Sequence, residues 1–332
     1  MKPYTYALLA AAAMCGLAAA ETAYTTPVGY VSNQVALAGQ FNVFGIPVHP
    51  STVAAGILDS ATATTVTDAA VNFTTTLTSG RTYILEITNG SGDGTIQEIT
   101  TWSGSTLDVP ANLTGIVTGG TTTYKLRPAA TVGSVFGATN SAGLLASANA
   151  DPAEADVIYI PDGNGGFTQI FYSSAEGFTG WYDTVNFADA TNTPLVYADG
   201  FLLQRRGGTN LTLTIVGEVK TTATLLSVNQ PFTYLGGVYP AGSTLGTSGL
   251  STSVLPSANA DPAEADVIYM PDGSGGYLQY FYSTAEGFTG WYDTVNFADS
   301  SNVEITPGIL VQRRAPSSYS AKLTPPPSYS SL

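Results

Sequence analysis

Acidic side chains beside a glycine-rich turn are the first residues of this 332-residue chain that could perform chemistry. Carboxylates grouped at a turn can bind Ca²⁺, because this hard cation prefers oxygen ligands. The pattern occurs twice, and the predicted calcium ligands are Asp151, Glu154, Asp156 and Asp162, with Asp261, Glu264, Asp266 and Asp272. Neither an EF-hand loop nor a nonapeptide calcium repeat is present, so the alternative that these carboxylates cap turns stays open. Ca²⁺ is the only cofactor that the sequence suggests.

A repeated aromatic segment offers a second kind of chemistry, the stacking of rings against sugars. The sequence GFTGWYD occurs at 177–183 and again at 287–293. Aromatic rings exposed there could bind carbohydrate, and the candidate ligand residues are Trp181, Tyr182, Trp291 and Tyr292. The alternative is that the rings pack in the core, as aromatic residues at a strand start often do.

The sequence does not predict a catalytic site. His49 is the only histidine, and the chain lacks the G-x-S-x-G element of many serine hydrolases. Carboxylate pairs are abundant, so a metal-dependent or carboxylate-pair hydrolase is a third hypothesis, but the separation of such pairs cannot be read from sequence. We therefore expect no catalytic residue and no enzyme activity.

Two arginine pairs, 205–206 and 313–314, carry much of the positive charge. Adjacent residues of a strand face opposite sides of a sheet. We therefore expect one arginine of each pair to meet a carboxylate of its own unit, and the other to meet solvent.

The N-terminus predicts secretion. Lys2 precedes a short apolar run that ends in alanines 18–20, which is typical of a cleaved signal peptide over 1–20. The run is too short for a membrane-spanning helix. The only cysteine, Cys15, lies inside this segment, so the mature chain is expected to be free of cysteine and of disulfides.

Charge and composition limit the classes of partner. Only 10% of residues are charged and the net charge is −14, so we expect no nucleic-acid or anionic-membrane partner. Threonine, serine and glycine are frequent, which favours extracellular β-sheet with many turns.

An internal duplication organises the chain. Residues 147–189 match residues 257–299 at 37 of 43 positions, with a constant offset of 110. Both stretches continue into a closing strand that ends in QRR. Upstream, PVGYV at 27–31 resembles IVGEV at 215–219, and FNVFGIPVHP at 41–50 resembles FTYLGGVYP at 232–240. The second copy therefore has Tyr239 where the first has His49.

The two copies differ by an insertion, because nearly a hundred residues separate Pro50 from Ser147 in the first copy. We name residues 27–50 and 131–215 the first copy, 51–130 the insert and 216–314 the second copy. Each copy is predicted to be an antiparallel β-sandwich or barrel. Five runs of β-forming residues with glycine turns predict a small β-barrel for the insert, at 63–68, 81–88, 94–100, 105–109 and 121–128.

Within a copy, two strands flank the turn at 162–166, which predicts a hairpin. The predicted core residues of the first copy are Phe171, Trp181, Val185, Phe187 and Leu202. The Pro- and Ser-rich segment 315–332 is predicted to be a flexible tail.

The VGxV opening, the FYxSxxGFTGWYD segment and the closing QRR strand resemble a family of uncharacterised secreted repeat proteins of environmental bacteria, over residues 27–314. The insert is similar to small barrels appended to surface and phage-tail proteins. The resemblance implies secretion and a repeated fold, and it provides no activity, cofactor or catalytic residue.

Our first hypothesis is a non-catalytic structural or interaction protein of the cell surface or extracellular matrix, whose partners are copies of itself or other surface proteins. The second is a carbohydrate-binding protein that uses the aromatic segment, with glycans as partners.

Overall fold

The computed structural model describes residues 27–332, and antiparallel sheets dominate them, so the all-β prediction is confirmed. The two described α-helices, α2 (Phe73–Thr76) and α3 (Val132–Phe136), are about one turn each. No helix in residues 27–332 has the length and apolar character needed to cross a membrane. The predicted signal peptide, with Cys15, lies outside the described residues.

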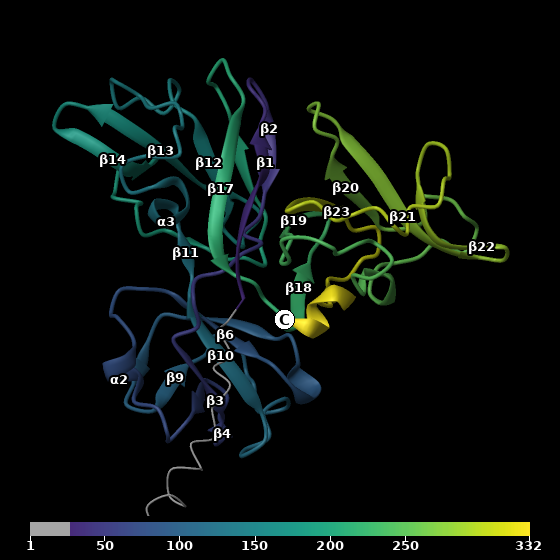
Figure 1. The fold of residues 1–332 in the computed structure, drawn as a ribbon, viewed down its shortest axis with the longest axis horizontal. Coiled ribbons are helices and arrows are strands. Elements are labelled where there is room, and N and C mark those ends of the chain that lie inside the picture. The colour runs from purple at the N-terminus through teal and green to yellow at the C-terminus, as the bar shows by residue number, and fades with distance from the viewer. Residues whose placement is uncertain (1–26) are drawn as a thin grey trace, which may run out of the picture.

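A five-stranded sheet forms the centre of the first copy (Figure 1). Its strands run in the order β14 (Phe178–Asp183), β13 (Phe167–Ala175), β12 (Val157–Pro161), β16 (Phe201–Gln204) and β2 (Phe41–Phe44). The predicted hairpin is confirmed, because β12 pairs with β13 around the turn at 162–166. Gly163 and Gly165 have φ values of 75° and 88° there, a conformation that glycine adopts without strain.

A second five-stranded sheet has the same strand order. It consists of β22 (Phe288–Asp293), β21 (Tyr277–Ala285), β20 (Val267–Pro271), β23 (Gly308–Gln312) and β19 (Phe232–Gly236). Residues of similar sequence therefore occupy corresponding strands in the two sheets. Neither sheet is closed into a barrel, since β2 and β19 are edge strands in the described pairings.

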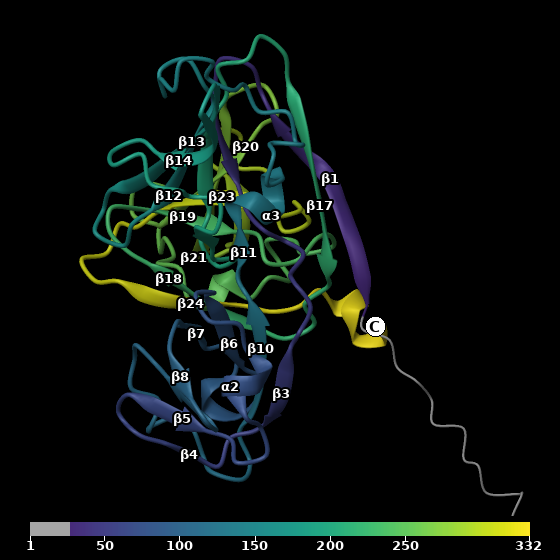
Figure 2. The ribbon, with the colours of Figure 1, turned by 90° about the vertical axis from the view of Figure 1, so that its left-hand side faces the viewer.

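A long ribbon joins the two copies. Strand β1 (Val28–Ala36) pairs antiparallel with β17 (Leu211–Glu218), so the two VGxV openings lie side by side (Figure 2). Gly29 pairs with Gly217, and each is the central glycine of its own opening. The ribbon therefore has a local pseudo-twofold axis at these glycines.

Two glycines let the sheets approach closely on either side of this ribbon. A Cβ atom at Gly308 would lie 2.8 Å from the backbone of Phe44, and one at Gly200 would lie 2.9 Å from the backbone of Leu235. Gly308 and Gly200 both start the closing strand of a copy, and Phe44 and Leu235 occupy matching places in β2 and β19. The closing segment of each copy thus packs against the edge strand of the other.

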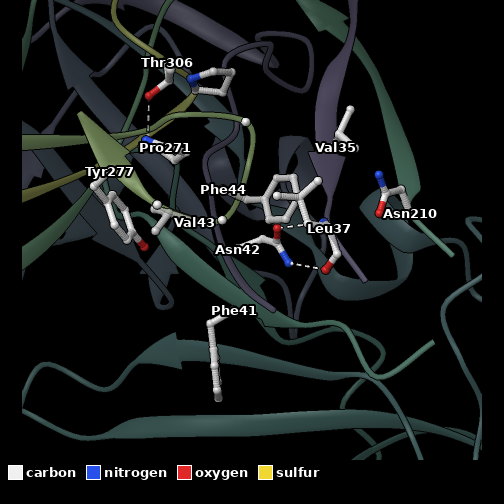
Figure 3. Close-up of a pocket in the computed structure, with 15 residues that line it drawn as sticks. Val35, Leu37, Phe41, Asn42, Val43, Phe44, Asn210, Pro271, Tyr277 and Thr306 are labelled. Atoms are coloured by element: carbon white, nitrogen blue, oxygen red, sulfur yellow. Dashed lines mark hydrogen bonds between the residues drawn. The ribbon is translucent and has the colours of Figure 1, made fainter. Parts of the chain in front are cut away.

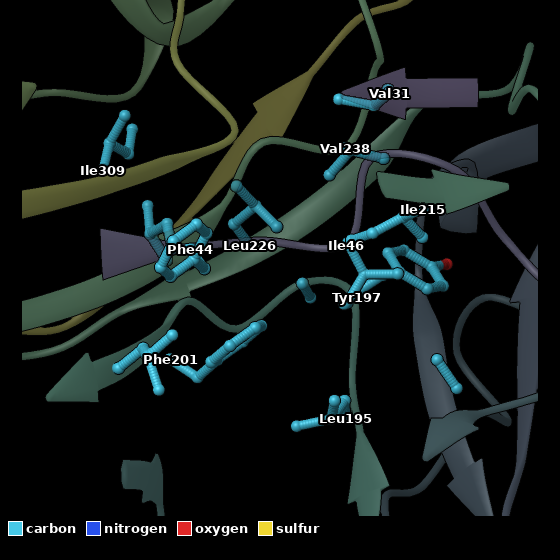
Figure 4. Close-up of a cluster of buried hydrophobic side chains, with 14 of the residues drawn as sticks. Val31, Phe44, Ile46, Leu195, Tyr197, Phe201, Ile215, Leu226, Val238 and Ile309 are labelled. Atoms are coloured by element: carbon cyan, nitrogen blue, oxygen red, sulfur yellow. The ribbon is translucent and has the colours of Figure 1, made fainter. Parts of the chain in front are cut away.

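The main hydrophobic core is shared between the copies. It contains first-copy residues such as Phe44 and Phe201 and second-copy residues such as Leu226 and Ile309 (Figure 4). Leu226 belongs to β18 (Thr224–Val228), and α3 contributes Val132 and Phe136. Sharing one core makes the two copies a single packed body.

The insert forms the lower lobe in Figure 1. Its strands build two four-stranded sheets instead of a closed barrel. The first sheet contains β3 (Ala54–Ile57), β10 (Thr123–Pro128), β6 (Tyr83–Ile87) and β7 (Ile96–Ile99), and the second contains β4 (Ser60–Ala61), β5 (Thr65–Thr67), β9 (Thr106–Asp108) and β8 (Trp102–Ser103). All five predicted strand runs contain a strand. A separate hydrophobic cluster, with Phe73 and Tyr124 fully buried, holds this lobe together.

The C-terminal segment corrects the expectation of a flexible tail over 315–332. Residues Tyr319–Leu323 form β24, which pairs with β18 through five residue pairs. Ala321 and Leu323 are buried in the shared core. A short 3-10 helix, Pro327–Ser331, follows. Alternation of buried and exposed side chains in β24 outweighs the Pro- and Ser-rich composition around it.

Candidate functional site

The most distinctive exposed feature is a loop that occurs in nearly identical form in both copies. We name residues 183–189 the first repeat loop and residues 293–299 the second repeat loop; both have the sequence DTVNFAD. They follow β14 and β22, which lie at opposite ends of the molecule's long dimension in Figure 1. Each loop therefore presents the same surface from a different end of the protein.

An aspartate fixes the conformation of each loop. One carboxylate oxygen of Asp183 accepts hydrogen bonds from the backbone N–H groups of Val185 and Asn186, at 2.9 and 2.6 Å, and the other accepts from Ala188 at 2.8 Å. Asp293 makes the same three bonds at the same distances. Backbone hydrogen bonds, first those from Asn186 and Asn296, lower the pKa of these two carboxyl groups. Ionised aspartates therefore hold the loops at neutral pH.

Both loops contain a strained phenylalanine. Phe187 and Phe297 have φ values of 55° and 57°, in the left-handed region that residues with a Cβ atom seldom adopt. Such strain persists only where surrounding structure imposes it, and it is common at functional sites. The aspartate bonds supply that structure here.

The loops expose apolar side chains that were predicted to be core. Val185 is 80% exposed and Val295 is 79% exposed, while Phe187 and Phe297 are about two-fifths exposed. The prediction for Val185 and Phe187 is wrong: the aspartate-capped turn leaves Val185 in solvent, and Phe187 covers Phe171 from outside, with ring centres 6.0 Å apart. Phe171, Trp181 and Leu202 are buried as predicted.

Aromatic rings form a rigid base beside each loop. Phe178 stacks on Tyr182 with ring centres 3.8 Å apart, and Phe288 stacks on Tyr292 at 3.7 Å. The loop phenylalanine lies 6.0 Å from this stack in the first copy and 6.1 Å in the second. We name Phe178, Tyr182, Val185 and Phe187 the first loop patch, and Phe288, Tyr292, Val295 and Phe297 the second loop patch.

None of the sequence differences between residues 147–189 and 257–299 lies in the loop patches. The six differences between 147–189 and 257–299 all lie in 160–174 and 270–284, which form the hairpin strands and the turn between them. One is a core change, Ile170 to Tyr280, and both side chains are buried. Cores usually constrain sequence more than exposed loops do. The identity of exposed residues beside a changed core marks the loop patches as the candidate site.

The predicted sugar platforms are only partly present. Trp181 and Trp291 are 0% and 1% exposed, so neither offers a ring face to a ligand. The indole N–H of Trp181 donates to the carbonyl of Gly137 at 2.8 Å. The carbohydrate hypothesis based on these tryptophans therefore fails, whereas Tyr182 and Tyr292 are half-buried members of the loop patches.

The predicted calcium ligands of the exposed loops accept hydrogen bonds from neighbouring backbone N–H groups and side chains. Asp151 accepts from the N–H of Ala153, and Asp162 accepts from those of Asn164 and Gly166. Glu154 accepts from Asn149 and Ser147. The second copy repeats these bonds at Asp261, Asp272 and Glu264. Within residues 27–332, the acidic side chains do not gather into a group of three that could hold a metal ion.

Asp156 and Asp266 have a different role, because both are fully buried. Asp156 forms an ion pair with Arg205, and Asp266 forms one with Arg313 at 2.6 Å. Arg206 and Arg314 donate their backbone N–H groups to the same carboxylates. The prediction that one arginine of each pair meets a carboxylate of its own unit is confirmed.

His49 lies in a buried ionic cluster where the insert and both copies meet. Glu86 and Arg127 of the insert form an ion pair at 2.8 Å, and Lys220 of the second copy lies 3.4 Å from Glu86. The His49 ring contacts Tyr197 edge-on at 4.5 Å. Burial, with Arg127 nearby, lowers the pKa of His49 to about 3.

This cluster connects the insert to both copies through buried contacts, and a substrate could not reach it. Its five charged or titratable side chains are 3% exposed or less: His49, Glu86, Arg127, Glu218 and Lys220. Burial opposes ionisation of Glu86, but Lys220 and Arg127 outweigh it and lower the pKa of Glu86 to about 2. Ion pairs that join three segments in this way fix their relative positions.

A cleft between the insert and the first copy contains carboxylates. Glu98 and Asp199 line it, and the adjoining cavities measure about 320 and 400 Å³. Burial, together with Glu98, raises the pKa of Asp199 to about 6. Histidine, lysine and arginine are missing from the described lining, which otherwise consists of uncharged residues and Asp162. Two carboxylates in one cleft are what the third hypothesis, a carboxylate-pair hydrolase, requires.

A second hollow lies between the two copies, along the edge strand β2 (Figure 3). It measures about 330 Å³. The first copy contributes Val35, Phe41 and Val43, and the second contributes Pro271 and Tyr277. We name it the inter-copy groove. Sequence reasoning missed it, because it exists only where the two sheets pack together.

Comparison with known proteins adds no assignment: no family model matches the chain, and neither a curated protein nor a solved structure resembles it significantly.

Proposed function

We propose that this chain is a secreted, non-catalytic structural protein of the cell surface or extracellular matrix that links two copies of one partner through its two loop patches. The supporting observation is the pair of equal, strained and apolar loops at opposite ends of one packed body. A linker needs two such patches well apart, because separated patches can engage different partner molecules.

The architecture between the patches fits a load-bearing connector. One hydrophobic core spans both copies, and the β1 and β17 ribbon contains seven residue pairs, three of which join the first copy to residues 216–218 of the second. A rigid connection preserves the distance between two bound partners and limits the entropy lost on binding.

Retention on secreted matrix material from the producing organism tests the proposal. The variant Val185→Asp with Val295→Asp should fold normally, since both valines are at least 79% exposed. We expect its retention to fall by about tenfold or more, because a charge would be placed in both apolar contacts. Val53→Asp, at an exposed valine of the insert, is the matched control.

Equal retention of the wild-type protein and the double variant would contradict the proposal. A strictly monomeric protein that binds no matrix, surface or polymer would do the same. If the purified chain hydrolysed a matrix polymer, the protein would be an enzyme and the linker proposal would be wrong.

A further inference from the structure

The pseudo-twofold axis relates the inter-copy groove to a corresponding place on the other side of the molecule, where side chains fill the space. We name that place the closed counterpart. Hairpin residue Phe167 of the first copy contacts Tyr234 of the second, with ring centres 5.9 Å apart. The matching residues are Tyr277 in the second copy and Val43 in the first. Both of these line the groove. The groove is therefore open because Val43 stands where the closed counterpart has the larger ring of Tyr234.

Ring faces are available inside this space. Phe41 is 52% exposed and Tyr277 is 37% exposed, and they come from opposite walls (Figure 3). Aromatic faces bind the apolar C–H faces of sugar rings as well as other flat apolar groups. Phe41 extends away from Tyr277 and packs on Tyr159, with ring centres 5.5 Å apart (Figure 3), so the two rings offer separate contacts to different sugar units of one oligosaccharide.

Polar groups in the groove are uncharged. The side-chain oxygen of Asn210 accepts a hydrogen bond from Ala38 at 3.0 Å, which orients its N–H₂ group. Of the turn glycines in the lining, Gly273 has open space around it, whereas the Gln40 side chain lies against Gly275 and Asp272 accepts a hydrogen bond from Gly276. None of the described lining residues is acidic or basic. Because the whole chain carries a charge of −14, anionic polymers are repelled and the groove offers no cation to compensate.

An extended peptide fits the groove less well than a sugar. A peptide that adds to a sheet needs a free run of strand edge. Strand β2 has only four residues, and Gly308 packs directly against the backbone of Phe44 at one end. The Asn42 side chain bonds to Leu37 at the other end. The available edge is therefore too short for a peptide ladder.

We propose that the inter-copy groove is a binding site for a neutral oligosaccharide, with Phe41 and Tyr277 stacking on sugar rings and Asn210 donating to a hydroxyl group. This site is separate from the two loop patches. It adds recognition of a neutral glycan to a chain whose linking contacts lie elsewhere.

The chain itself suggests the substitution that tests this proposal. Val43→Tyr places in the groove the residue found at the matching position of the second copy, so the variant should fold. Tyr234→Val is the matched control, because it alters the closed counterpart and leaves the groove unchanged. Affinity electrophoresis of the full chain in gels containing neutral β-glucan, mannan, xylan or galactan gives the binding constants, and alginate serves as the anionic comparison.

We expect the wild-type protein to be retarded by at least one neutral polysaccharide and not by alginate. Val43→Tyr should weaken that binding by about tenfold or more, whereas Tyr234→Val should retain it. Phe41→Ala, a second variant at an exposed ring, should also weaken binding.

Three results would overturn the proposal: no retardation by any neutral polysaccharide, undiminished binding by folded Val43→Tyr, or capture of uncharged peptides in place of glycans. Loss of glycan binding in the Val185→Asp and Val295→Asp variant, with Val43→Tyr unaffected, would move the glycan site to the loop patches. The linker proposal could survive any of these results.

Discussion

Gly29 of β1 lies directly opposite Gly217 of β17, so each glycine pairs with its counterpart from the other VGxV opening. The neighbours follow the same rule, since Tyr30 pairs with Val216 and Val28 pairs with Glu218. Two similar segments that pair antiparallel about their own centre behave as the interface of a symmetric dimer does. Here both halves of that interface belong to one chain.

The environments of these two glycines differ, which gives a matched pair of substitutions. A Cβ atom at Gly217 would lie 2.6 Å from the carbonyl oxygen of His49 and 2.8 Å from its backbone nitrogen. At Gly29 the nearest atom is a methyl group of Val219, at 3.3 Å. We expect Gly217→Ala to lower the free energy of unfolding by about 1–3 kcal/mol, because overpacking against backbone cannot relax. Gly29→Ala should change it by less than about 1 kcal/mol, and urea unfolding of both variants measures the difference. Equal effects would contradict the close approach at His49.

Removing the charge of Glu86 from the buried ionic cluster should destabilise the folded protein. Glu86→Gln removes the carboxylate that lies 2.8 Å from Arg127 and 3.4 Å from Lys220, and leaves Glu218, 3.7 Å from Arg127, as the remaining acidic partner. We expect a loss of about 3–5 kcal/mol in the free energy of unfolding. Asp108→Asn, in the same insert at an exposed carboxyl of β9, is the control. Comparable denaturation midpoints for the two variants would show that the cluster contributes little.

His49 should make the protein sensitive to mild acid. Its pKa is lowered to about 3 in the folded state, while an unfolded histidine titrates near 6.5. Below pH 6.5 the unfolded chain binds a proton that the folded protein excludes, so stability falls as the pH decreases towards 3. Glu86, whose folded pKa is about 2, adds to this loss only below about pH 4.5. Melting temperatures between pH 6.5 and 4.5 should decline less in His49→Gln than in the wild-type protein. Parallel profiles for the two proteins would contradict the burial of a neutral histidine.

Asp199 should make stability depend on pH in the opposite direction to His49. Burial raises its pKa to about 6 from the usual 3.8, so the folded protein holds a proton that the unfolded chain has already released. Stability contributed by this group is present at low pH and is lost as the pH rises through about 6. We therefore expect Asp199→Asn to raise the melting temperature at pH 7.5 and to leave it nearly unchanged at pH 4. A decrease at pH 7.5 would mean that the ionised carboxylate is stabilised in the cleft.

Local patterns in the sequence predicted the local structure well. The turn at 162–166 has glycines where positive φ is needed, and it forms the hairpin between β12 and β13. Arg205 and Arg313 reach buried carboxylates as predicted, although each lies just beyond the end of its closing strand. These features depend on residues close in sequence or on simple periodicity.

Features that depend on distant segments were predicted less well. Strand β24 is anchored by β18, about a hundred residues earlier, so composition alone suggested a flexible segment. One error is local instead: Val185 and Phe187 were assigned to the core, but the backbone bonds to Asp183 place them in an exposed turn. The groove requires the packing of two sheets, although the difference between Val43 and Tyr234 is visible in the sequence. Nonlocal contacts therefore account for most of the errors.

The most direct test of the linker is aggregation of matrix-coated particles by the purified protein. The wild-type protein should aggregate them, because its two loop patches lie at opposite ends of the molecule. Val185→Asp and Val295→Asp, each alone, should still bind the particles but fail to aggregate them. Aggregation by either single variant at the wild-type rate would contradict the claim that the two loops act as the two ends of a connector.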